Sequence, residues 1–127
     1  VERLNRKVLD AVDQITEGER LQLVDAQVAV VAYGFTGRSA ISAVKALRRE
    51  GVKAGLLRLK TLWPFPEKQV AALDGAVRRI LVPELNRGQV AGLVRQCVCT
   101  DVVSLSLTNG EVLEPKEIIE KVREVLP

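Results

Sequence analysis

The sequence predicts a three-layer α/β/α sandwich built on a mostly parallel β-sheet. The run Val28–Tyr33 is continuously apolar, as in strands that are covered on both faces. Further short apolar runs alternate along the chain with segments that repeat apolar residues at helical spacing. With 127 residues, 47% of them hydrophobic, the chain can bury a core without disulfide or metal staples. These observations favour an α/β fold.

The N-terminal segment is predicted to lie outside the sheet. Apolar residues recur at helical spacing over residues 2–16, and Glu17-Gly18-Glu19 ends this helix. We expect one domain over residues 1–127, in which residues 1–19 form a helix and connector and residues 20–127 form the α/β core. The core begins at Leu21–Val24, a brief alternating stretch with polar neighbours, which predicts a strand at the edge of the sheet.

The middle of the chain continues the alternation of strands and helices. After Val28–Tyr33, an apolar face from Ala40 to Leu47 predicts a helix that ends at Gly51, a common C-terminal glycine. Ala54–Leu59 is the next buried strand, and the Pro-rich stretch Thr61–Pro66 is a rigid connector. We expect Pro66 to start a short helix that ends at Leu73.

The last part of the chain completes the pattern. It holds a central strand at Ile80–Val82, a helix that starts between Asn86 and Gln89 and ends near Gln96, and a strand at Val102–Leu107. A turn at Thr108–Gly110 then leads to a final helix, for which Pro115 occupies a first-turn position.

Composition excludes several classes of function. The chain has no His, which rules out the usual catalytic triads and most zinc sites. Cys97 and Cys99 alone cannot complete a tetrahedral metal site, and we interpret them as small buried residues in a reducing cytoplasm. No apolar run is long enough to span a membrane, and no signal-peptide pattern opens the chain.

Positive charge is concentrated in the middle of the chain. The net charge is +3, yet residues 38–95 carry 12 Lys and Arg against 4 Asp and Glu. A basic middle suits an acidic partner, an anionic ligand or nucleic acid, and it is also compatible with a merely solvated face. Because only 3% of the residues are aromatic, few side chains could stack on bases, so we do not expect nucleic acid as a partner.

Two strand-to-helix turns carry the candidate functional residues. The first, Ala32–Ser39, is similar to a phosphate-binding loop, but Ala32 replaces the first glycine and Arg38 replaces the lysine. Its spacing also fails the dinucleotide fingerprint. Either Thr36 caps the following helix in a tight turn, or the turn contacts an anion or a partner.

The second turn is Val82–Gln89. Asn86 and Gln89 form a capping-box variant, which explains them without a function. Glu84 lies at the carboxyl end of a strand, where acidic residues often face a cleft, and both a structural and a functional role are open for it. Between the two turns, Trp63 and Phe65 either pack over the core or are buried by a neighbouring domain. No catalytic constellation is evident.

Four ordered blocks of the sequence resemble one enzyme family. Val31–Ala40 resembles a segment of the alpha subunit of 2-oxoacid:ferredoxin oxidoreductases, especially the 2-oxoglutarate enzyme. The resemblance continues through Glu50–Arg58, Thr61–Pro66 and Glu84–Gln89. Pro83 is a departure from the family pattern, and we expect it to end its strand early because it removes a ladder donor.

The resemblance implies a transketolase C-terminal-like fold with five strands in the order 1-3-2-4-5, strand 1 being antiparallel. It also implies that the chain is a fragment of a longer subunit, which agrees with the absence of an initiator Met. The implied reaction is the oxidative decarboxylation of a 2-oxoacid with coenzyme A, which yields an acyl-CoA, carbon dioxide and reduced ferredoxin.

The resemblance places the cofactors outside this chain. Thiamine diphosphate, Mg2+ and the iron–sulfur cluster would belong to other domains or to the beta subunit, and this domain itself would hold no cofactor. The implied partners are the beta subunit, the upstream domain of the same alpha subunit, ferredoxin and coenzyme A, in the cytoplasm. Two alternatives are open: the equivalent domain of a 2-oxoacid dehydrogenase beta chain or deoxyxylulose-phosphate synthase, and a non-catalytic module that binds an anion or nucleotide.

The implied strand order predicts where the functional surface lies. Strands 2 and 4 flank a topological switch point, and the two turns described above follow their carboxyl ends. Thr36, Arg38, Glu84, Asn86 and Gln89 would therefore come together as an interface or anion contact. We favour a partner subunit or domain at this place, with an Arg38–Glu84 ion pair, because Glu84 would oppose an anionic ligand.

Overall fold

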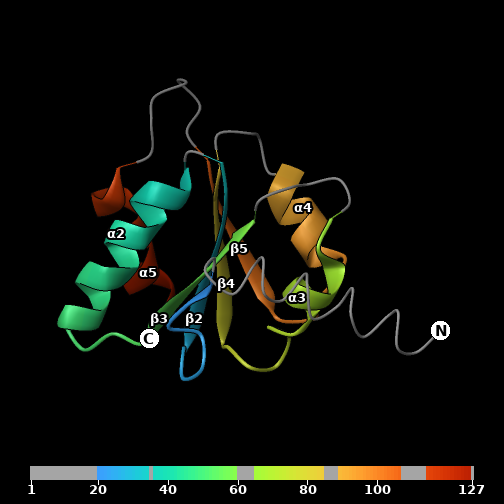
Figure 1. The fold of residues 1–127 in the computed structure, drawn as a ribbon, viewed down its shortest axis with the longest axis horizontal. Helices are drawn as coiled ribbons and strands as arrows, with labels where there is room; N and C mark the ends of the chain where they lie inside the picture. The colour runs from blue at the N-terminus through green and yellow to red at the C-terminus, as the bar shows by residue number, and fades with distance from the viewer. Residues whose placement is uncertain (1–19, 35, 60–64, 85–88, 107–113, 127) are drawn as a thin grey trace.

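The computed structural model of the protein describes residues 20–34, 36–59, 65–84, 89–106 and 114–126. These residues form a β-sheet with helices on both of its faces (Figure 1), so the predicted three-layer sandwich is confirmed. The predicted helix over 2–16 and the turn Thr108–Gly110 lie outside the described residues. The elements in chain order are β1 (Arg20–Leu21), β2 (Val28–Tyr33), α2 (Thr36–Arg49), β3 (Ala54–Leu59), α3 (Glu67–Ala71), β4 (Arg79–Glu84), α4 (Gln89–Arg95), β5 (Asp101–Ser106) and α5 (Pro115–Val125).

The strands follow the order β1-β3-β2-β4-β5, as expected. β1 is antiparallel to β3, and the other neighbouring strands are parallel. Strand β2 lies between β3 and β4, and its residues from Val28 to Ala32 are fully buried. A strand covered on both faces can be apolar at every position, which explains why its sequence shows no alternation.

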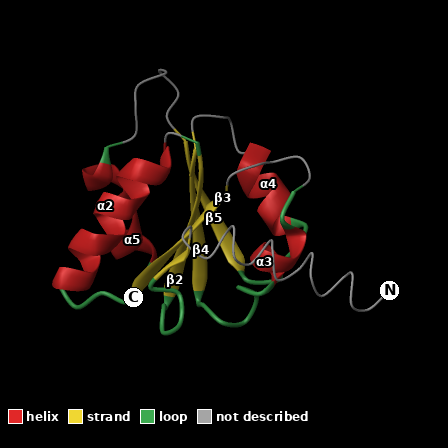
Figure 2. Cartoon of the chain, in the orientation of Figure 1, coloured by secondary structure: helices red, strands yellow, loops and turns green. Residues whose placement is uncertain are grey.

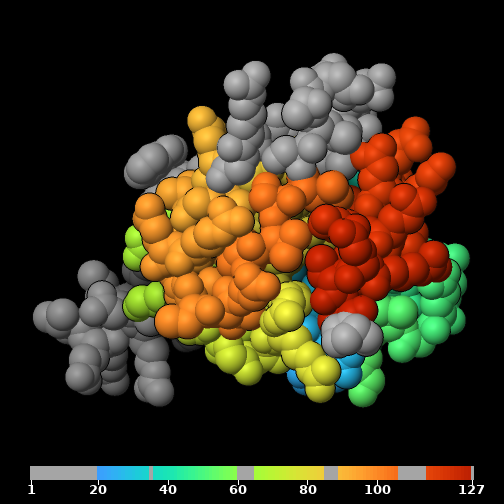
Figure 3. Space-filling view, turned by 180° about the vertical axis from the view of Figure 1, so that it is seen from behind, coloured from blue at the N-terminus to red at the C-terminus, as the bar shows by residue number. Residues whose placement is uncertain are grey.

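Two pairs of helices cover the sheet, one pair on each face (Figure 2). Helices α2 and α5 lie together on one face, and α3 and α4 lie on the other. Alternate residues of each central strand enter one core or the other, because successive side chains of a strand point to opposite faces. Viewed from behind, residues 89–106 and α5 lie side by side at the surface (Figure 3). No described helix is long and apolar enough to span a membrane.

Strand β1 is shorter than predicted. It pairs with β3 only through Arg20 and Leu21, so the prediction of a strand over Leu21–Val24 is wrong beyond its first residue. Gln22 adopts a left-handed backbone with φ 59°, which ends the extended conformation. The amide of Ala26 then bonds to the carbonyl of Leu23 at 3.3 Å and closes a turn into β2. This local turn overrides the alternating pattern.

Strand β4 is longer than predicted. It passes through Pro83 and ends at Glu84, and it pairs with β5 along its whole length. The expectation that Pro83 ends the strand early is therefore wrong. Pairing between β4 and β2 has already ended at Leu81, so no partner on that side requires an amide from Pro83.

The C-terminus of α2 confirms the role predicted for Gly51. Gly51 has φ 86°, a left-handed conformation that glycine adopts without a steric penalty. Its amide bonds to the carbonyl of Arg48 at 3.1 Å, and the amide of Val52 bonds to that of Leu47 at 2.9 Å. These two bonds form a Schellman motif, which satisfies carbonyls at the end of the helix and directs the chain towards β3.

Candidate functional site

The candidate site lies at the carboxyl edge of the sheet, where β2 and β4 end. The two strands are parallel to each other, so their carboxyl ends, Tyr33 and Glu84, lie at the same edge of the sheet (Figure 1). Pairing between the two strands ends at Val30 and Leu81, although β2 remains paired with β3 up to Tyr33 and β4 with β5 up to Glu84. The sheet therefore divides at its topological switch point, the position where ligand crevices form in open α/β sheets.

Glu84 is directed from β4 into the first turn of α4. Its Oε1 accepts the backbone N–H of Val90 and its Oε2 accepts that of Ala91, each at 3.0 Å. The side chain is only 4% exposed. The negative charge matches the positive N-terminal end of the helix dipole. Glu84 therefore caps α4, the role that the sequence had indicated for Asn86 with Gln89; Asn86 lies outside the described residues.

The expected ion pair between Arg38 and Glu84 is not observed in the part of the chain that the structure describes. Both oxygens of Glu84 bond to amides of α4, and its side chain is buried. Arg38 is exposed in the first turn of α2, and Gln89 is exposed as the first residue of α4. Arg38 and Gln89 thus remain accessible to a partner, whereas Glu84 serves the fold.

Thr36 closes the turn between β2 and α2. Its hydroxyl donates a hydrogen bond to the carbonyl of Tyr33 at 2.8 Å, and the side chain is buried. Thr36 is the first residue of α2, and this bond joins the start of the helix to the end of β2. Gly34 supplies the positive φ of 68° that the tight turn requires.

The structure adds Arg58 to this edge, which the sequence analysis did not identify. A Cβ atom added at Gly37 would lie 2.4 Å from Nε of Arg58, so the guanidinium passes directly over the first turn of α2. Arg58 lies near the end of β3, 21 residues further along the chain, and only the parallel pairing of β2 and β3 brings it here. With Arg38, it places two cations at a helix N-terminus that has no acidic residue in its first turn.

Aromatic side chains occupy two places near this edge. Tyr33 is the last residue of β2 and is 37% exposed, beside the point where the sheet divides. The sequence signal for it is a lone tyrosine at the end of a buried run. Phe65 is partly buried against the core that α3 and α4 cover, which confirms core packing for this residue. Trp63 lies outside the described residues.

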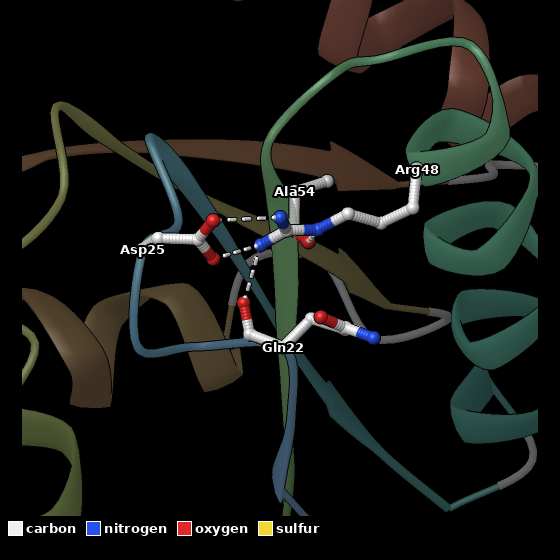
Figure 4. Close-up of polar contacts among 4 residues, drawn as sticks. All are labelled: Gln22, Asp25, Arg48 and Ala54. Carbon is white, nitrogen blue, oxygen red and sulfur yellow. Dashed lines mark hydrogen bonds and ion pairs between the residues drawn. The ribbon is translucent and has the colours of Figure 1, made fainter.

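A second polar cluster surrounds Arg48 at the opposite end of α2 (Figure 4). Its Nη1 and Nη2 bond to the two carboxylate oxygens of Asp25, at 3.1 and 2.7 Å. Nη2 also donates to the carbonyl of Gln22 at 2.7 Å, and Nε donates to that of Ala54 at 2.8 Å. Hydrogen bonding to Arg48 holds the pKa of Asp25 below its usual value of 3.8. This cluster fastens the turn before β2 to α2 and β3.

A third cluster joins the segments that precede β4 and β5. Oδ1 of Asp74 accepts the hydroxyl of Thr100 at 2.8 Å and the amides of Thr100 and Cys99 at 3.0 and 3.1 Å. Bonding to Thr100 lowers the pKa of Asp74 below 3.8. No group of three or more His, Cys, Asp or Glu suitable for a metal ion occurs among the described residues.

Both cysteines are free and lie between α4 and β5, rather than on a strand or helix. Cys97 is partly buried, and burial raises the pKa of its thiol above the usual 9.0. Cys99 is exposed, so the prediction that both are buried is wrong for this residue. Its position in the connection between α4 and β5 places it at the surface.

Comparisons with known proteins agree with the resemblance in sequence. The chain matches the family model described as pyruvate:ferredoxin oxidoreductase core domain II over residues 26–118. It is 36% identical over 124 residues to the 2-oxoglutarate synthase subunit KorA of Methanothermobacter marburgensis, which covers 96% of this chain and 33% of the relative. It is 42% identical over 103 residues to the ketoisovalerate oxidoreductase subunit VorB of Methanothermobacter thermautotrophicus, or 80% of this chain and 29% of that one.

Two solved structures share the fold. A 2-oxoglutarate:ferredoxin oxidoreductase from Magnetococcus marinus, with 2-oxoglutarate, coenzyme A and succinyl-CoA bound, matches with a TM-score of 0.73 and 27% identity over 79% of this chain and 18% of that one. A split-gene transketolase, an inactive beta4 tetramer, matches with a TM-score of 0.71 and 20% identity over 86% of this chain and 41% of the other, which shows the fold alone. The chain spans about a third of the length of the curated relatives.

Proposed function

The chain belongs to the family of the pyruvate:ferredoxin oxidoreductase core domain II, and on this basis we propose that it is the C-terminal domain of the alpha subunit of a 2-oxoacid:ferredoxin oxidoreductase. The observation that carries the proposal is the 36% identity to a 2-oxoglutarate synthase subunit over 96% of this chain. These relatives support the proposal over a domain of a 2-oxoacid dehydrogenase beta chain or of deoxyxylulose-phosphate synthase. In the proposed reaction, a 2-oxoacid and coenzyme A give an acyl-CoA and carbon dioxide, and ferredoxin accepts the electrons.

We propose 2-oxoglutarate as the first candidate substrate and 2-ketoisovalerate as the second. The 2-oxoglutarate synthase subunits match the greater length of this chain, and the solved oxidoreductase was named for the same acid. The 42% identity to a ketoisovalerate oxidoreductase subunit favours the branched acid as an alternative. The two acids differ at the end remote from the reacting carbonyl, where one carries a carboxylate and the other is apolar.

The proposed contribution of this domain is structural support and assembly. Iron–sulfur clusters are typically held by four cysteine thiolates, whereas the sequence contains two cysteines and the described residues hold no group of three or more His, Cys, Asp or Glu suited to a metal. The described residues therefore do not fit such a cluster. We place thiamine diphosphate, Mg2+ and the iron–sulfur cluster in other parts of the complex, which would act in the cytoplasm.

The proposed contacts with the beta subunit and with the upstream domain lie at the carboxyl edge of the sheet. Arg38 and Gln89 are exposed there, on either side of the switch point, and the proposal also includes Asn86. Thr36 and Glu84 are buried and support this edge by fixing the first turns of α2 and α4. Arg38→Ala combined with Gln89→Ala should weaken assembly with the beta subunit, whereas unchanged assembly would contradict this placement.

Activity of the assembled enzyme tests the proposed reaction. The full-length protein and its beta subunit would be supplied with thiamine diphosphate, Mg2+, coenzyme A and oxidised ferredoxin, and acyl-CoA formation followed with each 2-oxoacid. We expect turnover with 2-oxoglutarate that exceeds turnover with 2-ketoisovalerate. The 127-residue chain alone should be inactive under the same conditions. Absence of turnover with every 2-oxoacid would overturn the proposal, and preference for the branched acid would select the second candidate.

A further inference from the structure

The outer side of α2 carries a row of positive charge. The exposed residues of this helix are Arg38, Ser42, Lys45 and Arg49. The three cations lie within about 40° of one another around the helix axis and span about 16 Å along it. We call Arg38, Lys45 and Arg49 the basic row; Ser42 lies on the same side of the helix and carries no charge.

The basic row is not neutralised by the rest of the described structure. Within the described ranges, none of its three side chains makes a hydrogen bond or an ion pair. The nearby acidic residues are engaged elsewhere, since Asp25 bonds to Arg48 and Glu50 pairs with Arg123. Arg48 lies on the same helix but differs from the row, because its charge is paired with Asp25 within the fold.

Helix stability accounts for Arg49, which lies in the last turn of α2, but not for Arg38 in the first turn. Cations stabilise the last turn of a helix and oppose the dipole in the first turn, where Arg38 lies. A helix face that serves only solubility mixes both signs of charge. Helix α5 fits that description, since its exposed residues include Lys116, Glu120, Arg123 and Glu124. The exposed side of α2 has one sign only, which indicates a partner.

We propose that the basic row docks an acidic surface of another protein, which binds transiently. Rows of exposed charge act mainly through steering and complementarity, and they suit weak encounters better than permanent apolar interfaces. Helix α5 lies beside α2 (Figure 1) and exposes Glu120 and Glu124. Glu124 pairs with Lys121, and Lys116 and Arg123 are exposed on the same helix, so α5 presents both signs of charge to a partner. A protein surface, which also carries both signs, can match α2 and α5 together, and the low aromatic content of the chain disfavours nucleic acid. The proposal does not use the proposed reaction. Arg38 is also assigned to the proposed subunit contact, so the test is made on Lys45 and Arg49, which are not assigned to that contact.

Binding of polyglutamate and of a short DNA duplex to the full-length protein tests this proposal. Lys45→Gln and Arg49→Gln would be combined in one variant. A matched control combines Lys53→Gln and Lys68→Gln, which removes the same charge from exposed positions outside α2. We expect the α2 variant to bind polyglutamate about tenfold more weakly, the control to change by less than about twofold, and wild-type binding to weaken with salt.

Three results would overturn the docking proposal: equal weakening in the control variant, tighter binding of the DNA duplex than of polyglutamate, or no binding of polyglutamate by the wild-type protein. Thermal unfolding of the α2 variant should match that of the wild type, because neither substituted side chain makes a hydrogen bond or an ion pair in the part of the chain that the structure describes. Polyglutamate binding and acyl-CoA formation are measured separately, so either result can contradict its own proposal without affecting the other.

Discussion

The Glu84 carboxylate at the end of β4 accepts the backbone N–H of Val90 in the first turn of α4 at 3.0 Å. Its other oxygen accepts the next amide, that of Ala91, at the same distance. One buried side chain thus satisfies two helix amides that have no partner within the helix, and it joins a central strand to the helix that covers it. The edge that holds the candidate site depends on this junction.

Glu84→Ala should destabilise the protein. Removal of the carboxylate leaves two buried amides without acceptors, at a cost of about 1–3 kcal/mol. Glu84→Gln keeps one acceptor oxygen and should cost less, about 1 kcal/mol. Urea unfolding of the protein measures both changes. Gln89→Ala is the control, since this neighbouring residue is exposed, and a loss of stability equal to that of Glu84→Ala would contradict the capping role.

Asp25 should make stability depend on pH in the acid range. Hydrogen bonding to Arg48 lowers the pKa of Asp25 in the folded state below its usual 3.8, so the folded chain binds this proton more weakly than the unfolded chain. The stabilisation is then complete above about pH 4 and is lost as the pH falls through the folded pKa. The difference in unfolding free energy between wild type and Asp25→Asn should shrink on acidification. A difference independent of pH would contradict this assignment.

Arg48→Lys should destabilise the protein at all pH values. The guanidinium bonds to carbonyls of Gln22 and Ala54 as well as to Asp25, and one ammonium group cannot reproduce this fork. We expect a loss of about 1–2 kcal/mol, measured by urea unfolding at neutral pH. Arg49→Lys is a suitable control. Arg49 is the exposed neighbour of Arg48 and makes no such hydrogen bonds among the described residues, so this substitution should leave stability unchanged.

Gly37→Ala should be less favourable than Gly92→Ala. A Cβ atom at Gly37 would overlap Nε and Cδ of Arg58, and because this is the far end of a flexible side chain that can move aside, the displacement should cost less than about 1 kcal/mol. A Cβ atom at Gly92 meets nothing within 4 Å, so alanine there should stabilise α4 by about 0.5–1 kcal/mol. If the Arg58 contact is the cause, Arg58→Ala should reduce the cost of Gly37→Ala; an unchanged cost in the double variant would exclude it.

The two cysteines should differ in reactivity. Burial, together with the charge of Glu67, raises the pKa of Cys97, so little of it is thiolate at neutral pH. Cys99 is exposed. Iodoacetamide should therefore alkylate Cys99 first, which peptide mass spectrometry can follow over time. Equal rates at the two positions would contradict the difference in burial.

The regular elements could be predicted from local patterns. A strand buried on both faces is apolar at consecutive positions, which identified β2 and β3. A helix with one buried face repeats apolar residues at helical spacing and often ends at a glycine, which identified α2. The order of the strands came from the resemblance to a known family. Where a local conformation competed, as at Gln22, the pattern predicted the wrong boundary.

The candidate site shows what only the tertiary structure decided. The sequence by itself determined that Glu84 lies at the carboxyl end of one buried strand and that Arg38 follows another, and a parallel sheet brings these two ends to one edge. It did not determine that Glu84 turns into α4, that Arg58 passes over Gly37, or that Arg48 reaches Asp25, 23 residues earlier. Each of these contacts depends on the directions of side chains from elements distant in sequence. Residue periodicity fixes which face of an element is buried, whereas packing between elements decides which polar groups meet.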